Sequence, residues 1–328
     1  MSGARQQIVA RDEDGMRLDR WFGVHFPEVN FGHLQKLIRT GQVRIDSGRA
    51  KTNSRLEAGQ QVRIPPLEAQ VRRIEAKIDA EDAAFLRSLI IYEDDELYVF
   101  NKPSGLASQG GSGTKRHVDG LLKSLPNKQG EAPRLVHRLD RDTSGVLVVA
   151  KTRAAAAYFG KVFQSRGAHK IYWAIVYSVP KPAQGSISCF LAKQIVGDTE
   201  QMVVVEQSHP GAQHSKTFYS VTDTAGRRFA WVTLKPVTGR THQLRVHMQQ
   251  LGNPIIGDPR YFDIENWQGA PGLGEGLHLH ARRIRLPLPS GKSLDISAPL
   301  PPHMVQSFEA LGFDPDRFDV KEQDPEDA

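Results

Sequence analysis

The 328-residue sequence contains one cysteine, Cys189. It therefore cannot form an internal disulfide or a metal site built from several cysteines, and this composition fits a reducing compartment. The chain also lacks an apolar run long enough to cross a bilayer. Its first 16 residues are polar and charged, unlike a secretory signal. We therefore predict a cytoplasmic protein that does not associate with membranes.

Neither an internal repeat nor a phosphate-binding loop is present. The glycine cluster Gly110-Gly111-Ser112-Gly113 lacks the Lys-Ser/Thr pair that opens a helix after such a loop. Hydrophobic residues make up 39% of the chain, which is enough for a packed core, and the length predicts about two domains. The sequence is therefore typical of a globular protein without a nucleotide cofactor.

Basic residues outnumber acidic ones in the chain as a whole, but not at the C-terminus. The chain has a net charge of +6 and an isoelectric point near 9.4. The segment 314–328 holds seven acidic and two basic residues, so the remaining chain carries +11. A basic body with this charge favours a polyanionic partner, and nucleic acid is the commonest one. We expect the acidic tail to be disordered.

The most informative segment is the polar turn His137–Gly145. It contains the carboxylate of Asp140 and is followed by the Val-rich run Val146–Val149. An apolar run of this kind is typical of a buried strand, so the turn is attached to rigid structure. Rigid support is what a catalytic carboxylate needs to hold its position.

Four ordered motifs show a family resemblance. His137-Arg138-Leu139-Asp140 with Thr143-Ser144-Gly145 resembles the signature of the RluA/RluC/RluD group of ribosomal RNA pseudouridine synthases. Three further motifs occur in the family's order: Lys102–Leu106, His169–Ala174 and Gly239–His247. Gly257–Pro259 with Tyr261 follows as the family pattern predicts. Gln109–Gly113 is more similar to the RluC branch. The resemblance covers residues 90 to 300 and implies isomerisation of specific uridines to pseudouridine in 23S ribosomal RNA.

The resemblance also implies roles for individual residues. Asp140 would be the catalytic carboxylate, attacking C1′ or removing a sugar proton, with Arg245 as the cation beside it. Tyr172 would pack against the base and assist proton removal from C5. Arg138 would fill the space left by the flipped nucleotide, next to Leu139 in the substrate site. The reaction is redox-neutral, so we expect no cofactor, no metal and no obligate protein partner.

An N-terminal module has a pattern of its own. Helices are predicted at 16–24 and from residue 31 to a stop at Gly41, followed by short strands at 42–46 and 61–64. Two helices followed by a small basic sheet resemble the S4-type RNA-binding domain. Four basic residues are the predicted phosphate contacts of this module: Lys36, Arg39, Arg44 and Arg49.

Further along the chain, strands outnumber helices and adjacent strands are mostly joined by hairpins. The predicted strands are 97–102, 145–151, 170–179, 216–221, 229–237, 277–286 and 293–298, with helices at 153–165 and 241–251. A hairpin turn is expected at 223–226. The fold class is therefore α+β with a largely antiparallel sheet. The predicted organisation is an S4-like domain (1–66), a linker (67–80), a catalytic domain (81–313) and the acidic tail (314–328).

Three other functions are compatible with parts of this pattern. A glycoside hydrolase would need two carboxylates across a sugar, and Asp140 and Asp142 occupy one turn. For Arg138, the alternative to a role in base flipping is an ion pair with Asp142 in the same turn. An RNA-binding ribosome assembly factor without catalysis would keep the basic body. A zinc site could combine His278 and His280 with a histidine of the 239–247 motif, either His242 or His247.

Overall fold

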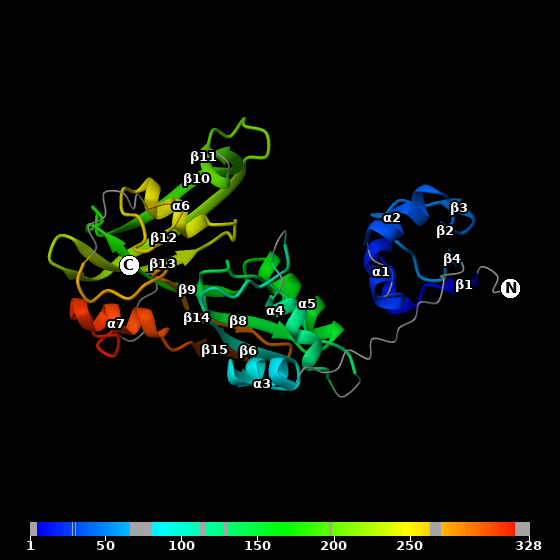
Figure 1. The fold of residues 1–328 in the computed structure, drawn as a ribbon, viewed down its shortest axis with the longest axis horizontal. Coiled ribbons are helices and arrows are strands. Elements are labelled where there is room, and N and C mark those ends of the chain that lie inside the picture. The colour runs from blue at the N-terminus through cyan, green and yellow to red at the C-terminus, as the bar shows by residue number, and fades with distance from the viewer. Residues whose placement is uncertain are drawn as a thin grey trace. The chain divides into compact units, whose positions relative to one another are not determined.

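The computed structural model describes residues 5–65 except 28 and 30, 80–127 except 112, 113 and 115, 130–196, 199–262 and 270–318. The predicted linker up to residue 79, part of Gln109–Gly113 and most of the acidic tail lie outside these ranges. The chain divides into two compact units, residues 1–77 and 78–328 (Figure 1). Among the described residues, no helix is both long and apolar enough to span a membrane.

The first unit packs two helices and a one-turn helix against a four-stranded sheet. Its elements are β1 (Arg5–Ile8), η1 (Arg11–Glu13), α1 (Leu18–His25), α2 (Phe31–Arg39), β2 (Arg44–Ile45), β3 (Gly48–Arg49) and β4 (Gln61–Ile64). The sheet order is β1-β4-β2-β3. Leu18, Trp21 and Phe22 of α1 are buried in its core, as their helical spacing predicts. In α2, Leu34 and Leu37 are buried in the same core, whereas Phe31 at the first position of the helix is 57% exposed.

The second unit is built on one large, twisted sheet. Its elements are α3 (Ala80–Ser88), β5 (Ile90–Glu93), β6 (Leu97–Lys102), α4 (Val118–Leu121), η2 (Leu122–Ser124), β7 (Arg134–Leu135), β8 (Ser144–Ala150), α5 (Arg153–Gln164), β9 (His169–Tyr177), β10 (Gln184–Val196), β11 (Thr199–Val205), β12 (Gln213–Ala225), β13 (Phe229–Pro236), α6 (Gln243–Gln250), β14 (Leu279–Pro287), β15 (Ser293–Ser297) and α7 (Pro302–Leu311). The strands follow the order β11-β10-β12-β13-β9-β14-β8-β6-β5. Within the described ranges, each strand pair of this sheet is antiparallel except β14–β8. The predicted α+β class is thereby confirmed.

Most predicted elements of this unit are present within two residues of their expected ends, but three differences are informative. Strand β12 continues to Ala225, so the turn before β13 is shorter than the predicted 223–226. Helix α6 begins at Gln243 because His242 adopts a left-handed backbone conformation, with φ of 52°. The hairpin of β10 and β11 was not predicted. Its side chains are largely half-buried or exposed, so no strict hydrophobic alternation marks it.

The strand register places residues of the predicted motifs side by side across neighbouring strands. Gly145 at the start of β8 pairs with Ala281 of β14, and Ala281 also pairs with Tyr172 of β9. Tyr172 in turn pairs with Leu234 of β13, whose chain leads on to α6. Four strands from distant parts of the sequence therefore meet in one row beside the turn that carries Asp140.

Candidate active site

A cavity of about 490 Å³ opens beside this row of residues. This volume lies in the range of small-ligand sites, about 300–1,000 Å³. Its walls include all five residues predicted for catalysis and substrate binding: Arg138, Leu139, Asp140, Tyr172 and Arg245. The structure thus brings together side chains that are separated by more than a hundred positions in sequence. Their individual roles stay predictions.

Side chains from the end of β6 and from the loop after it hold the turn of Asp140 in place. The ammonium of Lys102 is fully buried and donates to the carbonyl oxygens of Pro103 (2.9 Å), Leu106 (2.7 Å) and Arg141 (3.0 Å). Burial lowers the pKa of Lys102 to about 7, against the opposing charges of Asp142 and Asp140. Because Lys102 ties the carbonyl of residue 141 to its own loop, it limits movement of the turn.

Two serines of the same loop form hydrogen bonds to the backbone before and after Asp140. The hydroxyl of Ser108 donates to the carbonyl oxygen of Leu139 (2.7 Å) and accepts from the amide of the same residue (3.0 Å). The hydroxyl of Ser104 donates to the carbonyl oxygen of Asp142 (2.8 Å). The family resemblance of Lys102–Leu106 assigns no role to these side chains. A lysine ending an apolar strand was the signal that could have identified this support, because buried lysines are rare unless they are paired.

Gly145 explains why the turn ends in glycine. Its φ is +108°, and a β-carbon there would lie 2.3 Å from the carbonyl oxygen of Ala281. Side chains rarely adopt that backbone conformation, and no atom fits at that distance. Strand β14 can therefore approach β8 closely only at a glycine, and this close approach brings Tyr172 toward Asp140.

Tyr172 lies within the electrostatic influence of Asp140. Burial, together with the negative charge of Asp140, raises the pKa of Tyr172 above its usual value. The phenol is therefore protonated at neutral pH. This state suits packing against a base or hydrogen-bond donation better than removal of a proton.

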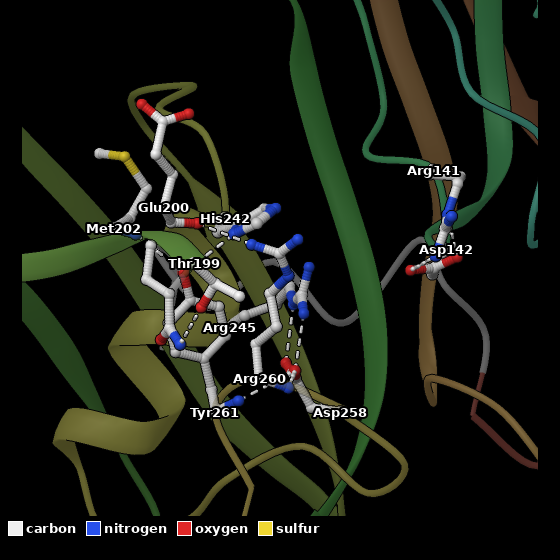
Figure 2. Close-up of polar contacts among 11 residues, drawn as sticks. Arg141, Asp142, Thr199, Glu200, Met202, His242, Arg245, Asp258, Arg260 and Tyr261 are labelled. Atoms are coloured by element: carbon white, nitrogen blue, oxygen red, sulfur yellow. Dashed lines mark hydrogen bonds and ion pairs between the residues drawn. The ribbon is translucent and has the colours of Figure 1, made fainter. Parts of the chain in front are cut away.

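Arg245 is held by an acidic partner that the sequence interpretation did not assign. Its guanidinium donates two hydrogen bonds to the carboxylate of Asp258, Nε at 2.7 Å and Nη2 at 2.6 Å (Figure 2). Both side chains are buried, at 3% and 0% exposure. Burial alone would lower the pKa of Arg245, but the hydrogen bonds and charge of Asp258, with the charge of Asp140, raise it. Arg245 is therefore a permanent cation, and the charge of Asp140 contributes to keeping it so.

The segment after Asp258 completes the support of Arg245. The ring of Tyr261 lies 5.0 Å from the guanidinium carbon of Arg245, and its amide donates to Asp258 (3.1 Å). The amide of Arg260 donates to the same carboxylate oxygen (2.9 Å). The Tyr261 hydroxyl lies 2.9 Å from Nδ1 of His242 (Figure 2). The Gly257–Pro259 motif therefore supplies the counter-ion that orients the arginine motif.

Arg138 and Leu139 occupy different environments. Arg138 is exposed at the cavity, whereas Leu139 is buried between the cavity wall and the core. Asp142 forms its ion pair with Arg141, with 3.0 Å between Nε and the carboxylate, instead of with Arg138. The alternative pairing of Arg138 with Asp142 is therefore wrong.

Two of the alternative functions find no support in this geometry. Asp140 is the one carboxylate among the described residues that line the cavity, whereas a glycoside hydrolase needs two. Hydrogen bonds occupy the histidines proposed for zinc: His278 lies 2.7 Å from the Ser307 hydroxyl, and His280 lies 2.8 Å from that of Ser144. Burial lowers their pKa values, to about 4 and about 3. In the described ranges, no group of three or more potential ligands could hold a metal.

The predicted phosphate contacts of the first unit also separate into two groups. Lys36, Arg39 and Arg49 line a shallow hollow. Arg44 does not line it, because its guanidinium donates to the carbonyl oxygens of Gly41 (3.1 Å) and Ser47 (3.2 Å). Arg44 therefore has a structural role in closing the β2–β3 turn, and the hollow instead includes two cations that were not predicted: Arg17 and Lys51.

Comparison with known proteins connects this geometry to one family. Residues 96–250 match the family described as RNA pseudouridylate synthase. The chain is 37% identical over 311 residues to ribosomal large subunit pseudouridine synthase C of Escherichia coli K12, covering 92% of this chain and 95% of that protein. It is 36% identical over 313 residues to the protein of the same name from Vibrio cholerae, covering 92% and 96%.

Two solved structures share the fold. Human RNA pseudouridylate synthase domain containing 4 has a TM-score of 0.59 and 31% identity, over 71% of this chain and 97% of that one. Human RNA pseudouridylate synthase domain containing 1 has a TM-score of 0.52 and 27% identity, over 69% and 95%. The ordered motifs, the shared fold and the identity over nearly the whole sequence lead to one conclusion: the chain belongs to the RNA pseudouridine synthase family.

Proposed function

We propose that this protein converts specific uridines of large-subunit (23S) ribosomal RNA to pseudouridine. The observation that carries this proposal is the single cavity shared by Asp140, Tyr172 and Arg245, in a chain whose relatives over 92% of its length are named large subunit pseudouridine synthases. Its lining has one carboxylate and several cations, which suits an anionic substrate. We place the activity in the cytoplasm, without an obligate protein partner.

The reaction needs one carboxylate and no net change in composition. The N1–C1′ bond breaks, the base turns within the cavity, and a C5–C1′ bond forms. The proton on C5 is lost and N1 takes up a proton, so the product is an isomer of the substrate. We assign to Asp140 either attack on C1′ or removal of a sugar proton. Arg245 is a cation of the cavity whose charge interacts with that of this carboxylate.

The target nucleotide must leave its stack to reach Asp140. Arg138 is exposed at the cavity, and within the described chain it has no carboxylate partner. We propose that its planar guanidinium occupies the space left by the flipped base and stacks on the neighbouring bases. Leu139 would form an apolar wall behind the base, because its backbone is held on both sides by Ser108.

The first unit would supply a second RNA contact. We propose that it is an S4-type RNA-binding domain and that the hollow lined by Lys36, Arg39 and Arg49 binds backbone phosphates. The charges of this hollow come from α2, from the end of β3 with the residues after it, and from Arg17 just before α1. One RNA strand could therefore contact several of them at once.

Neutralising the hollow is expected to weaken RNA binding and its salt dependence. In the triple variant Lys36→Gln, Arg39→Gln and Arg49→Gln, the slope of log affinity against log salt should fall by about 0.7 for each phosphate of single-stranded RNA that the variant no longer binds. KM for ribosomal RNA should rise, while the single-turnover rate at saturating RNA is kept. Arg44→Gln is the matched comparison. It should lower the stability of the first unit and leave the salt slope nearly unchanged. An unchanged slope in the triple variant would exclude the hollow as a phosphate site.

Metal removal is expected to leave the reaction unchanged. Because Ser307 and Ser144 already occupy His278 and His280, extensive chelation should not alter turnover on a short, prefolded RNA whose folding is checked separately. Zinc present at one equivalent in the purified protein, and lost together with activity, would contradict this assignment.

The function itself is tested by mapping pseudouridines in ribosomal RNA from a strain that lacks the gene. Specific sites in large-subunit RNA should revert to uridine, and the purified protein should restore them in RNA from that strain. An assembly factor without catalysis would bind the same RNA without forming pseudouridine, which would overturn the proposal.

A further inference from the structure

Lys170 faces the cavity from the same strand as Tyr172. The two residues are separated by two positions on β9, so their side chains point to the same face of the sheet. Both line the cavity. The register places Tyr172 opposite Ala281 and Lys170 opposite Ile284, so Lys170 lies closer to the beginning of β9 and to the end of α5. The family motif around Tyr172 gave no role to this lysine.

The cation that acts on Lys170 is Arg166. Helix α5 ends at Gln164, and Arg166 follows in a left-handed conformation with φ of 64°. The amide of Gly167 donates to the carbonyl oxygen of Val162 (2.9 Å) and closes the helix end. Arg166 is exposed and lines the same cavity. The fold therefore brings a second cation from another element to the wall formed by Lys170.

No acidic side chain compensates this pair within the described ranges. Lys170 is half-buried, and burial followed by the charge of Arg166 lowers its pKa. The carboxylate of the cavity, Asp140, acts on Tyr172 and Arg245 but is not among the groups that act on Lys170. A helix end favours a nearby cation, which would account for Arg166 alone. It does not account for a half-buried lysine facing it from β9.

Two neighbouring cations without a carboxylate partner repel each other in the unbound protein. An anion bound by both would offset this repulsion. RNA carries a phosphodiester on each side of every nucleotide, so a base in the cavity brings two such anions to its rim. A phosphate oxygen bound by ammonium and guanidinium groups forms charge-assisted hydrogen bonds, which are stronger than neutral ones. The chemistry of this wall is therefore that of a phosphate site.

We propose that Lys170 and Arg166 bind a phosphodiester adjacent to the nucleotide whose base occupies the cavity. This inference rests on the proposed function, because it takes RNA as the substrate. The two residues are positioning residues: they fix the sugar over Asp140 through the phosphate and take no part in the bond changes. Arg138 and the hollow of the first unit contact other parts of the RNA.

The first test compares charge-changing variants of the full chain. Lys170→Met keeps the aliphatic stem but loses the charge, and we expect KM to rise by about 10-fold or more, as for a missing hydrogen bond to a charged group. The slope of log affinity against log salt should fall by about 0.7. Arg166→Gln should act in the same direction, and Lys170→Arg should retain most of the affinity. Lys161→Met, on the exposed side of α5, is the matched control and should change neither quantity.

The second test changes the RNA and leaves the enzyme intact. A single methylphosphonate, placed 5′ or 3′ of the target uridine, removes one phosphate charge. With wild-type enzyme, one of the two positions should raise KM by about 10-fold. Lys170→Met should lose nothing further at that position, because the enzyme and RNA changes remove the same interaction and their effects are not additive. Lys161→Met should show the full methylphosphonate effect.

The outcomes separate this inference from the function on which it rests. If wild-type enzyme forms pseudouridine and Lys170→Met keeps the wild-type KM and salt slope, the phosphate site is wrong and the function stands. Additive effects at both linkages would lead to the same conclusion. If wild-type enzyme forms no pseudouridine in any ribosomal RNA, the proposed function and this inference are both overturned.

Discussion

Asp140→Asn is expected to abolish pseudouridine formation while RNA binding is kept. The substitution preserves the size and hydrogen bonding of the side chain and removes the negative charge that attack on C1′ or removal of a sugar proton requires. We expect single-turnover rates to fall by more than about 1,000-fold, which corresponds to a loss of about 4 kcal/mol in transition-state stabilisation. The measurement is single-turnover conversion of a short ribosomal RNA at saturating enzyme, alongside a direct binding assay.

Asp142→Asn is the matched control for this experiment. Asp142 belongs to the same turn, but its carboxylate forms an exposed ion pair with Arg141. Exposed pairs contribute about 1 kcal/mol or less, so this variant should keep turnover within about fivefold of wild type. If Asp140→Asn retains more than about a thousandth of wild-type turnover, Asp140 is not the central group.

Asp258→Ala is expected to have the largest effect on stability. The carboxylate of Asp258 is fully buried and accepts two hydrogen bonds from Arg245, besides those from the amides of Arg260 and Tyr261. Its removal leaves a guanidinium with 3% exposure unpaired. Breaking a buried pair in this way costs about 3–5 kcal/mol in the free energy of unfolding. Urea denaturation followed by circular dichroism measures this loss, and turnover should fall with it because Arg245 is no longer oriented.

Two further variants separate pairing from a general loss of packing. Glu200→Ala breaks the ion pair between Glu200 and Lys193, whose side chains are each 60% exposed. It should lower the free energy of unfolding by about 1 kcal/mol or less. Combining Arg245→Met with Asp258→Ala removes the unpaired charge and should recover part of the stability without restoring activity. An Asp258→Ala protein no less stable than Glu200→Ala would show that the buried pair is not needed to hold the fold.

Local patterns were sufficient to predict much of the second unit. The Val-rich run after Gly145 predicted strand β8, and the polar turn before it predicted a site held on rigid structure. The hairpin β10–β11 escaped prediction because most of its side chains face solvent and show no strict alternation. Hydrophobic patterns report which face of an element is buried, so they do not detect a hairpin that buries little.

By itself, the sequence determined the family and the set of candidate residues around Asp140, through the order and chemistry of its motifs. The tertiary structure decided what surrounds them. Sequence placed Arg245 beside Asp140, but only the fold shows Asp258 as its direct partner. It also shows Lys102 donating to the turn from a buried position, and Lys170 and Arg166 lining the same cavity. These contacts join residues tens of positions apart or on separate elements. They depend on how strands pair across the sheet, and neither residue periodicity nor local spacing carries that information.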